Sequence, residues 1–217
     1  GLRARGALFS CAAAMKMMIW LLSIAVVATT RQRCMTPNVT LVSPPQYIIN
    51  STTPGVNTVP GGFEGGNTVR WAGEYHMFTA TFPTFGWSEI NLEHWASHDG
   101  QSWARRDVLW WSHWNKGLWV IPNSPMPFYD EELRSWTIYY TLFHQPVKGW
   151  TANGTLWVAN SITGSIDGPY DFPGTRILAP SNASQPWEER LLDSVSTPFK
   201  LRNGATKSDQ WAIFYGS

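Results

Sequence analysis

Residues 63–81 read FEGGNTVRWAGEYHMFTAT, and this stretch decides the fold. Aromatic and β-branched residues occur on both sides of Ala72-Gly73, a pair of residues that favours a tight turn. The second run also alternates between side chains of different polarity, as a half-buried strand does. We therefore expect two strands, at 64–71 and 75–81, joined as a β-hairpin.

Similar runs follow along the rest of the chain. Asp99-Gly100 separates two of them, and an Asp-Gly pair between apolar runs is a strong hairpin signal. No amphipathic helix of convincing length occurs after residue 35, so the sequence indicates an all-β fold. Further strands are expected at 90–97, 103–109, 118–128, 136–143, 156–162, 175–178, 194–201 and 210–215, with a turn at 129–132.

Three of these strands repeat one motif. EYHMF at 74–78, SWTIYY at 135–140 and QWAIFY at 210–215 align, and they recur every 60 to 75 residues. A four-stranded unit that repeats at this period is typical of a β-propeller blade, while an irregular β-sandwich is the alternative. Two blades and half of a third are present, and propellers close with at least four. We therefore expect a propeller that is incomplete within these 217 residues.

The composition excludes several classes of protein. Only 14% of the residues are charged, and 14 residues are Trp, so the aromatic surface is too large for a disordered chain. A net charge of +1 without a basic run argues against nucleic-acid binding, and 18 Gly and 15 Pro exclude a coiled coil. Most tryptophans are expected to pack between blades, and those at strand positions are Trp71, Trp95, Trp103, Trp136 and Trp211.

Residues 1–34 have the features of a leader. Met15 is a plausible start, and Lys16 and an apolar run up to Ala28 match a secretory signal peptide that is cleaved after Ala28. A membrane anchor is the alternative, but the run is shorter than the roughly 20 residues that a span needs. Five basic residues and no acid precede residue 35, so the rest has 11 basic and 15 acidic residues. We expect a secreted, extracellular protein without stable membrane insertion after cleavage.

The remaining chain divides into two parts. Residues 35–62 are rich in Pro and Gly and are expected to be extended, and residues 63–217 form the partial propeller domain. The two cysteines, Cys11 and Cys34, would leave Cys34 alone after cleavage, so neither an internal disulfide nor a Cys-based zinc site is expected. Four sequons fit a secreted glycoprotein, at Asn38, Asn50, Asn153 and Asn182.

Candidate site residues follow from the expected propeller, in which the first strand of each blade lines the central channel. Polar groups at the start of these strands are Glu64 and Asn67 in the first blade, Asn123 in the second, and Asp193 and Ser196 in the third. Glu64 lies among glycines, where the backbone can approach a ligand closely. A solvated loop carboxylate is the alternative for Glu64, and a turn residue or strand-end cap is the alternative for Asp193.

Two carboxylates across a channel suit glycoside hydrolysis. One protonates the leaving oxygen, while the other activates water or attacks the sugar. We expect Glu64 and Asp193 to be this pair, with the pKa of Glu64 raised by partial burial. Trp114 and Trp119 lie near the expected channel rim, where aromatic rings can stack on a sugar.

The sequence gives no reason to expect a metal or a cofactor. The five histidines are His76, His94, His98, His113 and His144. His94 and His98 are four residues apart, but they fall on an expected strand and the turn after it, so the sequence does not indicate a helical zinc site. His76 and His94 fall on strands and are expected to be packing or surface residues. A Ca²⁺ ion in the channel is conceivable, but nothing in the sequence requires one.

At this point the chain resembles a known family. Residues 63–78, the segment HWASHDGQSW at 94–103 and SIDGPY at 165–170 are similar to motifs of five-bladed propeller glycosidases of glycoside hydrolase family 43, which include arabinanases and β-xylosidases. The resemblance covers residues 60–217. It implies a five-bladed propeller with three acids from different blades: a general acid, a general base and an Asp that tunes the acid.

The resemblance places Glu64 at the general acid. Asp193 is the nearest carboxylate in the third blade, but a strict alignment with Glu64 falls two positions later, on Val195. The second blade offers Asn123 and no acid at the corresponding strand. Either further blades supply the remaining acid, or the protein is a relative with altered or lost activity.

These observations predict a secreted glycoside hydrolase that acts on an extracellular oligo- or polysaccharide. The alternatives are a non-catalytic propeller that binds carbohydrate through the same channel, and a propeller that binds proteins through its surface loops. The expected partner is a carbohydrate, with no nucleic acid, and the full-length protein is expected to be a monomer.

Overall fold

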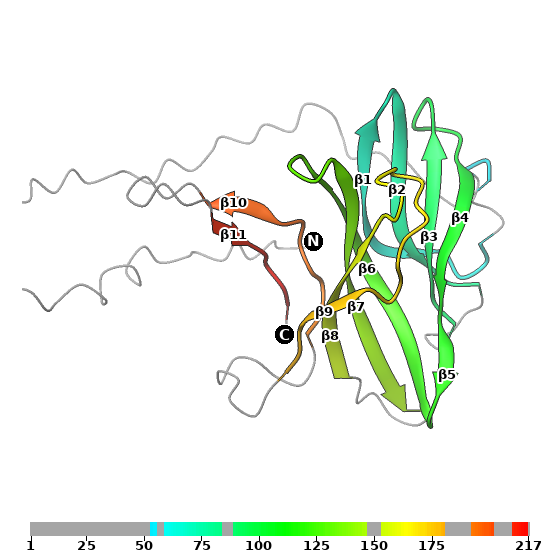
Figure 1. The fold of residues 1–217 in the computed structure, drawn as a ribbon. Helices are drawn as coiled ribbons and strands as arrows, with labels where there is room; N and C mark the ends of the chain where they lie inside the picture. The colour runs from blue at the N-terminus through cyan, green and yellow to red at the C-terminus, as the bar shows by residue number, and fades with distance from the viewer. Residues whose placement is uncertain are drawn as a thin grey trace, which may run out of the picture. The chain divides into compact units, whose positions relative to one another are not determined.

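The computed structural model describes residues 53–55, 59–83, 89–146, 153–180, 192–201 and 210–216. All regular elements in these ranges are β-strands (Figure 1), so the predicted all-β class is confirmed. The predicted leader at 1–34 lies outside the described residues, as does most of the segment at 35–62. None of the described segments forms a helix with the length and hydropathy of a membrane span.

The first sheet contains the hairpin that the opening stretch predicts. Its strands are β1 (Phe63–Trp71), β2 (Glu74–Thr81), β3 (Asn91–Ser97) and β4 (Ala104–Trp111), paired antiparallel in chain order. Ala72 and Gly73 close the β1–β2 turn with φ values of 49° and 90°. Two positive φ angles in a two-residue loop match the right-handed twist of the flanking strands.

The second sheet follows the same up-and-down order. Its strands are β5 (His113–Asn115), β6 (Leu118–Asp130), β7 (Ser135–Pro146), β8 (Asn153–Asn160) and β9 (Thr175–Leu178). A third, two-stranded sheet pairs β10 (Phe199–Leu201) with β11 (Gln210–Ala212). Each of these strands except β5 corresponds to a predicted run.

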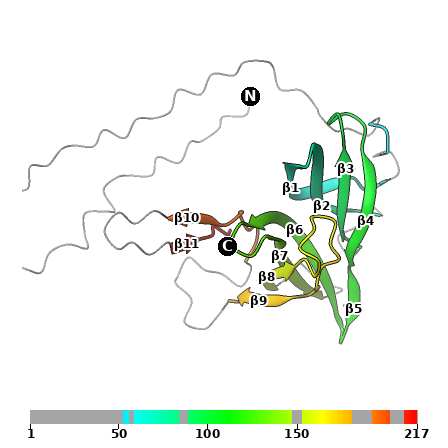
Figure 2. The ribbon, with the colours of Figure 1, turned by 45° about the horizontal axis from the view of Figure 1, so that its top comes forward.

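Three local predictions are corrected. Strand β5 was not expected; β4 runs on into it (Figure 2), and Lys116-Gly117 then turns the chain into β6. The turn expected at 129–132 lies two residues later, at 131–134. Asp130 Oδ1 accepts hydrogen bonds from the amides of Glu132 and Leu133 at 2.8 and 3.0 Å and so fixes the turn there. The strand expected at 194–201 is regular only over its last three residues.

Alternation along the strands builds a core between the first two sheets. On β2 and β3, Phe78, Ala80 and Leu92 face one way and are fully buried against the second sheet. On β7, Trp136, Ile138 and Tyr140 meet them from the other side. Burying a Phe, Leu or Ile side chain contributes roughly 1.5–3 kcal/mol, so this layer is a main source of stability.

The opposite face of the second sheet is also covered. Leu156 of β8 packs against Leu192 and Val195, which precede β10, with Tyr139 and Ile213 beside them. The second sheet therefore lies between two packed layers, and the strands within each sheet follow chain order. A two-sheet sandwich has one such core, whereas successive propeller blades stack face on face, so the packing favours the partial propeller.

The tryptophans divide by position. Trp95, Trp103 and Trp136 are buried, as expected. Trp71 and Trp211 are 38% and 49% exposed, so for these two the expected core position is wrong. Both lie at or next to the end of a hairpin. The ring of Trp71 packs against Tyr129 and that of Trp211 against Phe128, and the rest of each ring is in solvent.

Candidate active site

Two first strands carry the same β-bulge. In the β1–β2 pair, Glu64 lies opposite Ala80, but Asn67 lies opposite Phe78, so two residues of β1 face one of β2. In the β6–β7 pair, Asn123 lies opposite Thr141 and Met126 lies opposite Tyr139. A bulge of this kind re-aims side chains and is frequent next to active sites.

The third segment repeats the bulge. Asp193 forms an antiparallel bridge with Gly216, and the amide of Ser196 donates to the carbonyl of Phe214 at 2.8 Å. Ser194 and Val195 therefore face the single residue Tyr215, as in the other two bulges. Asp193 is therefore structurally equivalent to Glu64 and Asn123, and the strict alignment on Val195 was wrong by two positions.

A residue with a left-handed backbone conformation follows the candidate site residue in all three bulges. The φ values are 62° at Gly65, 50° at Ser124 and 51° at Ser194. For the two serines this conformation costs of order 1–3 kcal/mol, and such strain is concentrated at functional sites. The repeat is thus a backbone feature that the residue types alone do not reveal.

Two of the three side chains at these positions are held by the amide of the residue that follows them. Asn123 Oδ1 accepts a hydrogen bond from the Ser124 amide at 2.6 Å, and Asp193 Oδ1 accepts one from the Ser194 amide at 2.5 Å. These contacts fix a short side chain against its own backbone. Glu64 is one methylene longer, so its carboxyl reaches further from the strand.

The first two bulges are in contact. A Cβ built on Gly65 would lie 3.1 Å from Ser124 Oγ and 3.4 Å from Asn123 Oδ1. The third bulge is close enough to act electrostatically: burial, and then the negative charge of Asp193, raise the pKa of Glu64. The structure therefore brings Glu64, Asn123 and Asp193 together. The predicted direction of the Glu64 pKa shift agrees with this geometry.

The other two candidates of the first strands also occupy equivalent places. Asn67 and Ser196 both stand at the far side of their bulges, where the second blade has Met126. Asn67 is exposed, and its Oδ1 accepts from the Thr68 amide at 2.8 Å. Ser196 Oγ accepts from the Phe214 amide and donates to the Thr197 carbonyl, so its hydroxyl supports the bulge. Substrate contact by either residue stays a prediction.

The predicted aromatic pair lies on the hairpin that precedes the second bulge. Trp114 of β5 faces Trp119 of β6 across the ladder, with ring centroids 5.6 Å apart in an edge-to-face arrangement. Trp114 is 48% exposed, so one side of its ring is open to solvent. The same strand leads from Trp119 to Asn123. A role of this pair in sugar binding stays a prediction.

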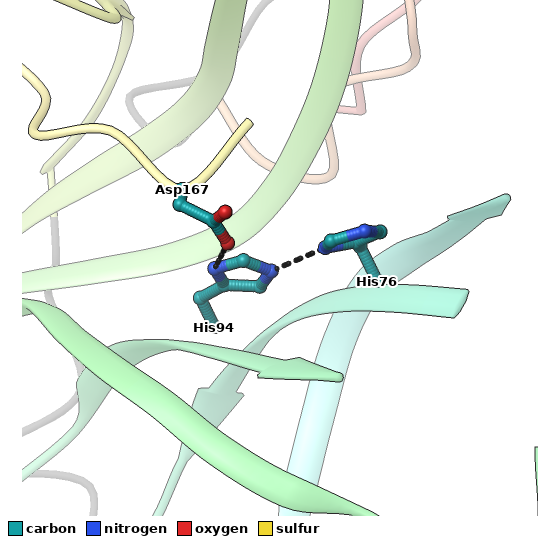
Figure 3. Close-up of side chains that lie close together, drawn as sticks. All are labelled: His76, His94 and Asp167. Atoms are coloured by element: carbon teal, nitrogen blue, oxygen red, sulfur yellow. Dashed lines mark hydrogen bonds and ion pairs between the residues drawn. The ribbon is translucent and has the colours of Figure 1, made fainter. Parts of the chain in front are cut away.

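A cluster that the sequence did not predict lies on the first sheet. His76 and His94 are buried side by side on β2 and β3 (Figure 3), and Asp167 approaches them from the segment between β8 and β9. They are diagonal neighbours, because His76 pairs with Ala96 and His94 with Phe78. The two histidines become neighbours through the pairing register of β2 and β3. The i, i+4 spacing of helical metal sites does not reveal such a pair.

Comparisons with known proteins give a structural likeness only. No protein-family model and no curated protein matches the chain. A β-1,3-galactosidase of glycoside hydrolase family 43 aligns with 63% of this chain and 27% of its own length, at 20% identity and a TM-score of 0.43. A family 117 glycoside hydrolase from the marine bacterium Zobellia galactanivorans aligns with 68% of this chain and 50% of its own length, at 14% identity and 0.45.

A third similar structure is the exo-β-1,3-galactanase of Phanerochaete chrysosporium. It aligns with 65% of this chain and 30% of its own length, at 11% identity and a TM-score of 0.41. The chain thus spans half or less of these three proteins. Family 43, whose motifs the sequence resembles, is among the matches. At these identities and TM-scores the likeness concerns the fold, and no residue role or substrate is carried to this chain.

Proposed function

We propose that the protein is a glycoside hydrolase in which Glu64 is the general acid and Asp193 is the second carboxylate. The observation that supports the proposal most strongly is the place of these two acids at equivalent bulges. The raised pKa of Glu64, caused by burial and by the charge of Asp193, agrees with it. A general acid must hold its proton at working pH, and both burial and a neighbouring carboxylate favour the protonated form.

The chemistry divides between the two carboxyl groups. Glu64 would donate its proton to the glycosidic oxygen as the bond to the sugar breaks, so that the leaving group departs as a neutral alcohol. Asp193, already oriented by the Ser194 amide, would accept a proton from the attacking water. Asn123 lies between the two positions in chain order and can donate a hydrogen bond to a sugar hydroxyl through its Nδ2.

One observation favours a second candidate, a propeller that binds carbohydrate without cleaving it. Asn123 occupies the bulge position that is equivalent to Glu64 and Asp193, yet an amide can neither give nor take a proton in catalysis. Binding would then use the same bulges and the open ring of Trp114.

Substitution Glu64→Gln separates the two candidates. In the full-length protein, we expect hydrolysis of β-1,3-galactan and α-1,5-arabinan oligosaccharides to fall by about 10²- to 10⁴-fold, with binding retained. Glu131→Gln, in the exposed turn after β6, is the matched control. If wild type binds a sugar but never cleaves one, the non-catalytic candidate is correct. If Glu64→Gln cleaves at the wild-type rate, Glu64 is not the acid.

We further propose an extracellular location, which rests on the signal-like residues 15–28. Recovery of the protein from culture medium, with an N-terminus after Ala28, tests the location.

A further inference from the structure

The bulge that follows Glu64 faces a single residue of the neighbouring strand. Glu64 lies opposite Ala80, and the two glycines after Glu64 together face Thr79 of β2. A bulge takes its extra residue out of the regular ladder and leaves backbone groups there without a strand partner. The side chain opposite the bulge is therefore the one placed to bind these groups.

The hydroxyl of Thr79 contacts the backbone on both sides of Glu64. Its Oγ1 lies 3.1 Å from the Gly65 carbonyl oxygen and 3.2 Å from the Ala80 carbonyl oxygen, and it can donate to either. Gly65 follows Glu64 in the chain, and Ala80 is its partner in the ladder. Because Thr79 is only 2% exposed, little solvent competes for this hydroxyl. One buried group thus joins the two strands at the candidate acid.

The backbone after Glu64 is the part of β1 that most needs such a contact. Gly65 and Gly66 have φ values of 62° and 95°, and glycine has more freedom than any other residue to leave a given backbone conformation. The second bulge restrains Gly65 from another side, since a Cβ built on it would lie 3.3 Å from the Ser124 Cα. Contacts from Thr79 and from Ser124 therefore fix Gly65 together.

The three candidate side chains differ in what holds them. Asn123 and Asp193 each accept a hydrogen bond from the amide of the next residue. Glu64 has no hydrogen bond of this kind among the residues that the structure describes. The place of its carboxyl group therefore depends on the conformation of the bulge.

The second sheet shows that a bulge does not bring this hydrogen bond with it. There the residue opposite the bulge is Tyr140. Its hydroxyl donates to the Pro173 carbonyl at 2.7 Å, in the segment that leads to β9. The contact from Thr79 thus belongs to the bulge whose acid lacks a backbone partner.

We propose that Thr79 is a positioning residue for Glu64, and that its hydroxyl fixes the bulge from which the Glu64 carboxyl reaches the candidate site. The inference rests on the proposed role of Glu64 as general acid, but it concerns the backbone that holds the acid. Thr79 is buried and acts through Gly65 and Ala80, so it is not itself a catalytic residue.

Substitution Thr79→Val removes the hydroxyl and keeps the shape of the side chain. In the full-length protein we expect kcat to fall by about 10- to 100-fold with KM unchanged within about twofold, because a catalytic group displaced by about 1 Å loses rate rather than substrate binding. Thr79→Ser keeps the hydroxyl and should retain most of the wild-type kcat. Thr79→Ala removes the same hydroxyl and should behave as Thr79→Val does, so the test does not depend on the folding of one variant.

Thr81→Val is the matched control. Thr81 is fully buried two residues further along β2, and its Oγ1 donates to the Asn91 carbonyl of β3 at 3.5 Å, away from the bulge. This variant should keep the wild-type kcat and KM. Equal losses in Thr79→Val and Thr81→Val would overturn the proposal, because a general loosening of the strand would then explain both. A Thr79→Ser variant as slow as Thr79→Val would overturn it as well.

A second measurement does not depend on hydrolysis. NMR titration of the ¹³C-labelled Glu64 carboxyl reports the surroundings of this group in each variant. Burial, and then the charge of Asp193, raise the pKa of Glu64. A carboxyl that moves away from these surroundings should titrate closer to its ordinary value. We therefore expect a lower pKa of Glu64 in Thr79→Val than in wild type, and the wild-type pKa in Thr81→Val.

The two measurements separate this inference from the proposed function. If Glu64→Gln cleaves at the wild-type rate, Glu64 is not the acid, and the titration alone decides whether Thr79 positions its carboxyl. If Glu64→Gln is inactive but Thr79→Val keeps the wild-type kcat, the inference about Thr79 is overturned and the proposed function stands. In either case, a Glu64 carboxyl that titrates in Thr79→Val as it does in wild type overturns the inference.

Discussion

Burial, and then the negative charge of Asp193 on a separate chain segment, raise the pKa of Glu64. The two acids stand at equivalent bulges, and Asn123 occupies the third equivalent place. A nearby negative charge disfavours the ionised form of a carboxyl group, so the charge of Asp193 favours a proton on Glu64. The relationship makes Glu64 a better proton donor near neutral pH than an isolated glutamate.

The first bulge depends on a glycine. A Cβ at Gly66 would lie 2.0 Å from the Phe78 carbonyl oxygen, and the φ value there is 95°. We expect Gly66→Ala to lower the free energy of unfolding by about 3 kcal/mol or more, because backbone strain and a clash with backbone add together. Urea unfolding measures the effect.

Gly73→Ala is the control for this change. Gly73 has a similar φ of 90°, but nothing lies within 4 Å of an added Cβ. Only the left-handed strain then remains, so the loss should be about 1–2 kcal/mol. Equal losses for the two variants would show that the bulge does not need the close approach at Gly66.

The packing beneath Asp193 gives a second prediction. Leu156 is fully buried against Leu192 and Val195, which flank that acid. Leu156→Ala should destabilise the protein by about 2–5 kcal/mol and should also lower hydrolysis, since the cavity loosens the segment that positions Asp193. Leu133→Ala, at a side chain that is 72% exposed, should change stability by about 0.5 kcal/mol or less. Similar losses of stability in the two variants would contradict the packing of Leu156 against Leu192 and Val195.

The aromatic hairpin gives a third prediction. Removing the exposed ring with Trp114→Ala should raise KM several-fold, up to about tenfold, with kcat unchanged, because a stacked sugar contributes about 0.5–1.5 kcal/mol of binding. Trp111→Ala, whose ring is 58% exposed on the preceding strand, is the matched control and should leave KM unchanged. A KM that rises equally in both variants would place the sugar elsewhere.

Much of the fold follows from the sequence, because strand periodicity and turn residues are local signals. The runs around Ala72-Gly73 and Asp99-Gly100 were located to within a residue or two, and Glu64 and Asp193 were singled out before their proximity was visible. Strand β5 escaped prediction because three residues are too few to show a period. The equivalence of Asp193 with Glu64 was missed by two positions, since a bulge shifts register without a change in residue type.

The histidine cluster could not be predicted for a different reason. His76 and His94 become neighbours only through the β2–β3 register, and Asp167 joins them from a distant segment. Long-range packing of this kind leaves no spacing signal in one sequence. The same holds for Trp71 and Trp211, whose exposure depends on the neighbouring layers.

The most direct test of the account is the pH dependence of kcat/KM in wild type and Asp193→Asn. With Glu64 as the proposed general acid, activity should be lost as pH rises through the raised pKa of that residue. Removing the Asp193 charge lowers this pKa, so the basic limb of the profile should move to lower pH, together with a lower maximal rate. A basic limb that stays at the wild-type position in Asp193→Asn would contradict the pairing of the two acids.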